Sequence, residues 1–227
     1  MAQQFAVKAV LLDLDGTLLD TVLDLHAAAN GMLRDLGRAE VAIADIRAYV
    51  GRGIPNLVKR CLAGRLDAAA DPAPPPAEAL ASFKRHYAAT NGIHTAIYPG
   101  VIDGLNALRE KGLRLACITN KAEAFTLPLL ERTGLAGYFA AVVSGDSLPK
   151  SKPDPAPLLW VCERFGVKPQ EAPLIGDSLN DFKAARAAGC PVFLVPYGYN
   201  EGMDVRNLEC DAIVATVFDA VRLITCA

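Results

Sequence analysis

Short, uninterrupted apolar runs recur along the chain, and segments with helical periodicity separate most of them. The runs are continuous rather than alternating, as expected for parallel strands that are covered on both faces. They comprise residues 10–12, 113–118, 140–143, 174–175, 192–195 and 213–217. Strands and helices that alternate in this way predict an open α/β fold built around a parallel sheet.

This alternation is interrupted between about residues 21 and 92, where no convincing strand is present. Apolar residues recur at helical spacing over 22–36 and again over 80–87, and segments 43–50 and 56–62 have the pattern of shorter helices. The proline-rich run 71–76 cannot lie inside a helix and is expected to form a loop. We therefore expect a small helical domain to be inserted after the first strand.

The composition of the chain limits which binding partners and which cellular compartment are expected. Apolar residues make up 52% of the 227 residues, so a packed core is expected, and the net charge of −2 gives no support for a nucleic-acid or anionic-membrane partner. The chain contains no signal-peptide pattern and no apolar stretch of the roughly 18 residues that span a bilayer. Its six cysteines lack Cys-x-x-Cys spacing and are expected to be thiols in a reducing cytoplasm. The oligomeric state stays open.

Four of the expected strands run directly into polar residues at their carboxyl ends. These segments are DLDGT at 13–17, TNK at 119–121, SGD at 144–146 with SKP at 151–153, and GDSLND at 176–181. In an open α/β sheet, ligands bind at the carboxyl ends of the strands. Residues that are distant in sequence are therefore expected to meet in one crevice.

The chemistry of this crevice is set by its charged groups. Asp13, Asp15 and Asp177 would repel one another unless a cation lies between them or one of them is protonated. Oxygen ligands without histidine or cysteine indicate Mg²⁺, which usually binds one or two carboxylates together with water and a substrate phosphate. Thr119, Lys152 and the N–H groups at helix N-termini can hold phosphoryl oxygens. This combination favours phosphoryl transfer.

The ordered segments LLDLDGTLLDT, ITNK, SKPDP and GDSLND resemble the four motifs of the haloacid dehalogenase superfamily. The resemblance covers essentially the whole chain and implies a Rossmann-like core of residues 1–19 and 92–227 with a helical cap of residues 20–91. Within the superfamily, the segments VGRG, FTLPLLERTGL and VPYGYNEG resemble bacterial phosphoglycolate phosphatases. The implied activity is Mg²⁺-dependent hydrolysis of a small phosphorylated metabolite, with conversion of 2-phosphoglycolate to glycolate and phosphate as the first candidate.

The resemblance also implies roles for individual residues. Asp13 would attack phosphorus and form an aspartyl-phosphate, while Asp15 would protonate the leaving alkoxide and then activate water. The metal would be bound by the carboxylates of Asp13 and Asp177 and by the backbone carbonyl of Asp15. Thr119 and Lys152 would stabilise the phosphoryl oxygens as charge develops on them.

Three further residues have less direct expectations. Asp181 would orient Lys152 or a metal-bound water, and its spacing from Ser178 also fits a helix capping box. Asn120 fits either a helix cap or a contact with the substrate phosphate. Arg52 lies between two glycines of the insert and would suit a substrate that carries a carboxylate.

Other functions share part of this pattern. A broader sugar-phosphate phosphatase or a phosphomutase would use the same nucleophile. The motif of such mutases, however, has valine at the position that Thr17 occupies in this chain. A dehalogenase would need neither Asp15 nor a metal. A receiver module of signalling proteins also collects aspartates, a threonine and a lysine around Mg²⁺, but it stores an acyl phosphate and needs an open face for its partners. The acid/base group Asp15 and the insert of about 70 residues favour the hydrolase.

Overall fold

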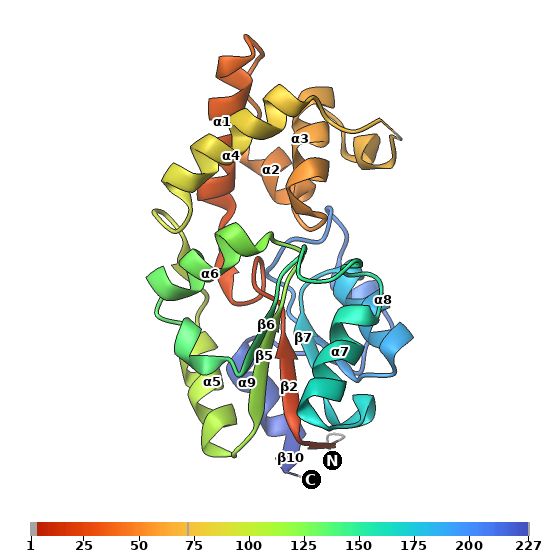
Figure 1. Ribbon diagram of the computed structural model, residues 1–227. Coiled ribbons are helices and arrows are strands. Elements are labelled where there is room, and N and C mark those ends of the chain that lie inside the picture. Colours follow the sequence, from red (N-terminus) through yellow and green to blue (C-terminus); the bar gives the residue numbers. More distant parts are fainter. Residues whose placement is uncertain (1–3, 72, 227) are drawn as a thin grey trace.

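A six-stranded parallel sheet forms the centre of the lower part of the molecule in the computed structural model, which describes residues 4–71 and 73–226 (Figure 1). The strands occur in the order β6-β5-β2-β7-β8-β9, and every neighbouring pair is parallel. Their bounds are β2 Ala9–Leu12, β5 Arg114–Ile118, β6 Ala141–Val143, β7 Leu174–Gly176, β8 Val192–Leu194 and β9 Ala212–Ile213. The predicted α/β fold with a parallel sheet is therefore confirmed.

Helices cover both faces of this sheet, which explains why its strands are apolar without interruption. On one face lie α5 (Val101–Glu110), α6 (Glu123–Arg132) and α9 (Val217–Ala220); on the other lie α7 (Ala156–Phe165) and α8 (Leu179–Ala188). Val10 and Leu12 of β2 pack into the first layer, while Leu11 packs into the second. Successive side chains of a strand point to opposite faces, so both sets must be apolar.

The order in which successive strands are added to the sheet reverses at β2. The chain proceeds from β2 to β5 and β6 on one side, and then returns to β7, β8 and β9 on the other. The loops after β2, β5 and β7 therefore leave the same edge of the sheet beside one another. This is the position where open α/β sheets bind ligands.

The strand prediction was wrong in details near both ends of the chain. The run 213–217 contributes only Ala212–Ile213 as a strand, because Thr216 caps the next helix by accepting a hydrogen bond from the backbone N–H of Asp219. The sequence pattern also missed a parallel pair between β1 (Phe5–Val7) and β10 (Ile224–Cys226). This pair lies beside the chain ends at the bottom of Figure 1.

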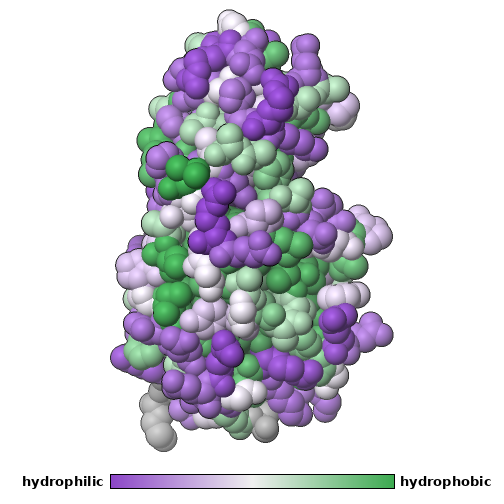
Figure 2. All heavy atoms as spheres, turned by 60° about the vertical axis from the view of Figure 1, so that its left-hand side comes forward, coloured by the Kyte–Doolittle hydropathy of each residue, from purple (hydrophilic) through white to green (hydrophobic). Residues whose placement is uncertain are grey.

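Four helices form a separate unit at the other end of the molecule. They are α1 (Val22–Asp35), α2 (Ile43–Tyr49), α3 (Gly53–Ala63) and α4 (Ala77–Thr90). Their apolar faces pack into a buried cluster of their own, which Phe125 and Tyr199 of the core also join. In the space-filling view this unit is a narrower upper lobe on the wider core (Figure 2). The division at residues 20–91 stays a prediction, and we refer to this helical unit as the cap.

The chain crosses between core and cap twice, and the two crossings lie side by side. Strand β3 (Leu19–Asp20) pairs antiparallel with β4 (Ala96–Ile97). Next to this pair, the buried carboxylate of Asp24 accepts hydrogen bonds from the backbone N–H groups of Gly92 and His94, each at 2.8 Å. Such contacts fix the geometry of both crossings, because a buried carboxylate needs its partners to offset desolvation.

The described part of the chain shows no helix that has both the length and the apolar character required to cross a bilayer. Its cysteines are all unpaired, and four of them are buried, including Cys117 and Cys190 inside the sheet layers. These thiols contribute as packed apolar side chains.

Candidate active site

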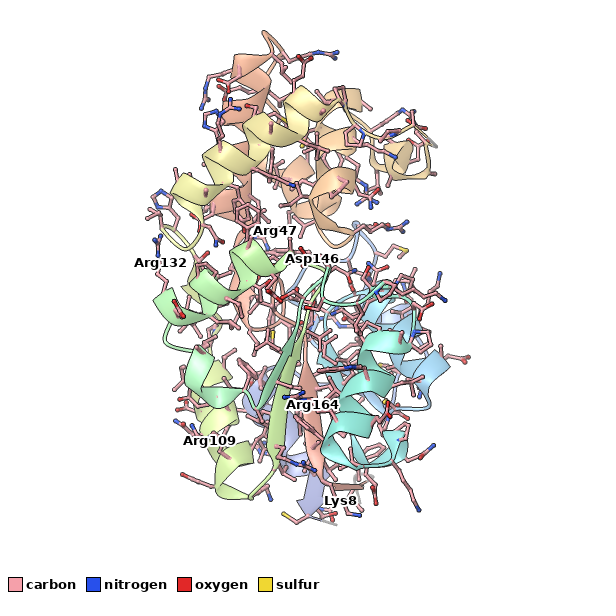
Figure 3. The ribbon with its side chains drawn as sticks, viewed as in Figure 1. Lys8, Arg47, Arg109, Arg132, Asp146 and Arg164 are labelled. Carbon is pink, nitrogen blue, oxygen red and sulfur yellow. The ribbon has the colours of Figure 1, made fainter. Side chains whose placement is uncertain are left out.

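The polar loops after β2, β5 and β7 meet in one pocket beneath the cap. The free space inside is about 50 Å³, room for a few water molecules. From the core it is lined by Asp13, Asp15, Thr119, Asn120, Lys121, Lys152, Asp177, Ser178, Asn180 and Tyr199, and from the cap by Leu25, Val50, Gly51, Gly53, Ile54, Leu57 and Tyr87. Figure 3 labels Arg47 and Asp146 close to the level at which cap and core meet.

At the bottom of the pocket, one buried lysine joins two carboxylates. The ammonium group of Lys152 lies 2.7 Å from Asp13 Oδ1 and 2.7 Å from Asp181 Oδ1. Burial raises the pKa of Asp13 to about 7, and although Lys152 counteracts this rise, the negative charge of Asp181 adds to it. Burial alone would lower the pKa of Lys152, but the two carboxylates raise it above its ordinary value. Lys152 therefore stays charged beside Asp13.

Asp181 is fully buried, and both of its carboxylate oxygens accept hydrogen bonds. Its Oδ1 accepts from Lys152, while its Oδ2 accepts from the Ser178 hydroxyl at 2.6 Å and from the Ser178 backbone N–H at 3.1 Å. The bond from the Ser178 N–H, together with the bond from the Asp181 backbone N–H to the Ser178 hydroxyl oxygen, forms the capping box of α8. The capping and lysine-orienting interactions thus occur together in one side chain.

Asp177 is held by the loops after β2 and β8. Its Oδ1 accepts from the Thr17 hydroxyl at 2.7 Å, and its Oδ2 accepts from the backbone N–H of Tyr199. Glycines at 16 and 198 are required here, because a Cβ at either position would overlap the Asp177 carboxylate, and Gly16 has φ of +91°. Burial raises the pKa of Asp177 well above its ordinary value, and the charges of Asp13 and Asp181 raise it further.

This arrangement fits a metal site. Carboxylate oxygens of Asp13, Asp177 and Asp181 lie within 4.8 Å of one another in the buried cluster. Of these three carboxylates, Asp13 and Asp177 line the pocket, whereas Asp181 lies behind Lys152 and does not line it. Hard oxygen donors suit divalent cations such as Mg²⁺, and a cation would offset both the burial and the mutual repulsion that raise the pKa values of Asp13 and Asp177.

The raised pKa of Asp13 predicts how the stability of the metal-free protein changes with pH. Between its ordinary pKa of 3.8 and the folded value of about 7, the folded protein binds more protons than the unfolded chain. The stabilisation is therefore complete below pH 3.8 and is lost as the pH rises through about 7. In urea unfolding with a chelator present, the free energy of unfolding of wild type should fall by a few kcal/mol as the pH rises over this range, compared with that of Asp13→Asn. Parallel curves for the two proteins would contradict the assignment.

Lys121 is a second buried lysine of the site, and the sequence analysis gave it no role. Its ammonium group contacts Asp15 Oδ1 at 3.0 Å and Oδ2 at 3.3 Å, and it also donates to the hydroxyl of Tyr87 from α4. Asp15 Oδ1 accepts a further hydrogen bond from the Thr21 hydroxyl at 2.6 Å. The only available signal was the position of Lys121 directly after Thr119 and Asn120 in a strand-end motif.

The two residues that precede Lys121 lie on the pocket wall. Thr119 is buried, and its hydroxyl oxygen accepts from the backbone N–H of Lys121 at 3.2 Å. The side-chain amide of Asn120 donates to the backbone carbonyls of Gly51 and Lys152, at 3.0 Å and 2.8 Å. Asn120 thus joins the cap loop to the core, and its contact with substrate stays a prediction.

Arg52 lies outside the pocket. Its Nε is 2.7 Å from Glu201 Oε1, and the same carboxylate oxygen is 2.6 Å from the buried guanidinium of Arg60. Glu201 belongs to the loop after β8, so this ion pair connects the cap to the core. The structure brings together Asp13, Asp15, Thr119, Asn120, Lys152, Asp177 and Asp181, but it does not bring Arg52 to them. The predicted contact between Arg52 and substrate stays a prediction.

Known proteins resemble the chain over nearly its full length. Residues 7–189 match the model of the haloacid dehalogenase-like hydrolases. A protein of Nitrosospira multiformis named phosphoglycolate phosphatase is 58% identical over 96% of each chain, and one of Thiobacillus denitrificans with the same name is 54% identical over 96% of each chain. The crystal structure of a predicted phosphoglycolate phosphatase from Haemophilus somnus has a TM-score of 0.86 at 31% identity, covering 96% of this chain and 97% of that one.

Proposed function

The chain belongs to the haloacid dehalogenase-like hydrolase family, and we propose that it is a Mg²⁺-dependent phosphatase that converts 2-phosphoglycolate to glycolate and phosphate. One observation carries the proposed reaction: Asp13 lines the pocket beneath the cap, 2.7 Å from the Lys152 ammonium and in one buried carboxylate cluster with Asp177. The names of the relatives supply the proposed substrate. The cytoplasm is the proposed compartment, because buried thiols without disulfides suit a reducing environment.

In the proposed reaction, Asp13 and Asp15 have complementary roles. A carboxylate oxygen of Asp13 forms a bond to phosphorus while the bond from phosphorus to the ester oxygen breaks, and Asp15 gives its proton to that leaving oxygen. Asp15 then takes a proton from water, which attacks the phosphorus of the aspartyl-phosphate. Phosphate leaves, and the Asp13 carboxylate is restored.

The surrounding groups hold the phosphoryl oxygens and balance their charge. Lys152 is fixed by Asp181 and supplies a permanent positive charge next to Asp13, while Thr119 supplies a hydroxyl on the pocket wall. Mg²⁺ bound by the carboxylates of Asp13 and Asp177 and by the Asp15 carbonyl would add Lewis-acid stabilisation of the phosphoryl oxygens. Such electrostatic stabilisation is the main catalytic requirement of phosphoryl transfer.

The cap excludes water from this reaction. It contributes apolar side chains to the pocket, including Leu25, Ile54 and Leu57. Excluding bulk water strengthens every electrostatic interaction inside the pocket. Because the free space is only about 50 Å³, the cap has to move for substrate to enter.

A substrate panel tests the proposed function. We expect phosphate release to require Mg²⁺ and to be fastest, in kcat/KM, with 2-phosphoglycolate among sugar phosphates, 3-carbon phospho-acids and simple alkyl phosphates. A chelator should abolish turnover, and re-addition of Mg²⁺ should restore it. A preference for sugar phosphates would overturn the proposed substrate but leave the proposed reaction in place. A phosphorylated protein that persists for hours in Mg²⁺ would instead indicate a phospho-accepting receiver function.

A further inference from the structure

The proposed substrate carries a carboxylate, and this inference about its binding rests on the proposed function. In 2-phosphoglycolate the carboxylate carbon lies two bonds from the ester oxygen that must receive the proton of Asp15. The carboxylate therefore has to lie within a few ångströms of Asp15. A carboxylate placed against the apolar cap residues Leu25 and Leu57 without a donor would be strongly destabilised.

Two cationic side chains occur among the described residues that line the pocket, and their surroundings differ. Lys152 is enclosed by Asp13 and Asp181, at the position where phosphorus must be attacked. Lys121 lies beside Asp15, with a distance of 3.0 Å from its Nζ to Asp15 Oδ1, and extends toward the cap. Arg52 does not line the pocket. Lys121 is therefore the cation at the place where the carboxylate has to lie.

Lys121 and Tyr87 also have hydrogen-bond donors to offer. The Lys121 ammonium has three acceptor atoms, the two carboxylate oxygens of Asp15 and the Tyr87 hydroxyl oxygen, so a substrate carboxylate would share its N–H donors with Asp15. The Tyr87 hydroxyl accepts from Lys121, and no residue in the described ranges accepts the proton of that hydroxyl. Two adjacent donors can hold one carboxylate, and those from charged groups form the stronger hydrogen bonds.

We propose that the Lys121 ammonium and the Tyr87 hydroxyl bind the carboxylate of the substrate and thereby select phosphorylated acids over phosphate esters that lack a carboxylate. Lys121 comes from the core and Tyr87 from helix α4 of the cap. The pair is thus complete when the cap packs on the core, so carboxylate binding is coupled to closure of the pocket. Arg52 pairs with Glu201 and so connects cap and core, and in this proposal it does not contact the carboxylate of the substrate.

A purely structural role for Lys121 makes a different prediction. If Lys121 served only to orient Asp15, its removal would weaken the binding of ligands with and without a carboxylate to the same extent. The ratio of two dissociation constants therefore distinguishes the roles, whereas loss of activity alone does not.

Calorimetric titration of the Mg²⁺-loaded protein tests the proposal without turnover. The ligands are 3-phosphonopropionate, which has CH₂ in place of the ester oxygen, and the analogue of the same shape in which a neutral carboxamide replaces the carboxylate. Wild type should bind the carboxylate about ten- to hundredfold more tightly than the amide, as expected for hydrogen bonds to a charged group. Lys121→Met should reduce this ratio to within about threefold, Tyr87→Phe should reduce it partly, and the matched control Arg52→Met should retain it.

Three results would overturn the proposal. Retention of the wild-type ratio by Lys121→Met, with thermal unfolding that shows a folded protein, would exclude carboxylate binding by Lys121. Loss of the ratio in Arg52→Met alone would assign this role to Arg52. Wild type without any preference for the carboxylate would overturn the inference; if the substrate panel still favoured 2-phosphoglycolate, the proposed function would stand without it.

Discussion

Asp13→Asn should lower kcat/KM by at least about 10⁴-fold while leaving the fold intact, because the amide nitrogen and oxygen cannot replace a carboxylate nucleophile. Asp13 lies against Lys152 in a buried site, so no neighbouring carboxylate can take its position without moving. In the described structure Asp181 is committed to Lys152 and Ser178, and Asp177 to Thr17 and the Tyr199 backbone.

Phosphate release under saturating Mg²⁺ measures this effect. The matched control is Asp146→Asn, which changes an exposed carboxylate that accepts a hydrogen bond from the backbone N–H of Glu123 near the same edge of the sheet (Figure 3). The control should stay within a few-fold of wild type. If Asp13→Asn kept more than about 1% of wild-type activity, Asp13 would not be the nucleophile.

Lys152→Met should be the most destabilising of these substitutions. It leaves the buried carboxylates of Asp13 and Asp181 without their cation, and loss of one partner of a buried ion pair typically costs about 3–5 kcal/mol. Turnover should fall as well, because Asp13 would lose the positive charge that offsets its burial.

Urea unfolding at neutral pH in a chelator measures the loss of stability. The control Lys183→Met removes an exposed lysine of the same helix that carries Asp181 and should change the free energy of unfolding by less than about 0.5 kcal/mol. Equal stability of the two variants would show that Lys152 is not paired with the buried carboxylates.

The core of the fold was predictable because its signals are local. Each of the six apolar runs corresponds to a strand of the sheet, since a strand covered on both faces must be apolar at every position. The convergence of polar residues at Asp13, Thr119 and Asp177 follows from the shared direction of parallel strands. Strands β3 and β4 escaped prediction because each has two residues, too few to give a periodic pattern.

Contacts between side chains from distant segments were not predictable in the same way. The sequence gives no indication that Lys121 faces Asp15, because that contact depends on how two loops leave neighbouring strands. The prediction for Arg52 used its position in the cap loop, but its observed partner Glu201 comes from a loop 149 residues away. Residue type and spacing identify candidate groups, whereas the direction of each side chain is set by tertiary packing.

Trapping the covalent intermediate tests the central claim most directly. Wild-type protein with Mg²⁺ and 2-phosphoglycolate would be quenched during turnover and treated with borohydride, which reduces an aspartyl-phosphate to homoserine. Peptide mass spectrometry should then find homoserine at position 13, only with substrate present and not in Asp13→Asn. Turnover of 2-phosphoglycolate with no modification at Asp13, or with the modification at Asp15 instead, would contradict the assignment of the nucleophile.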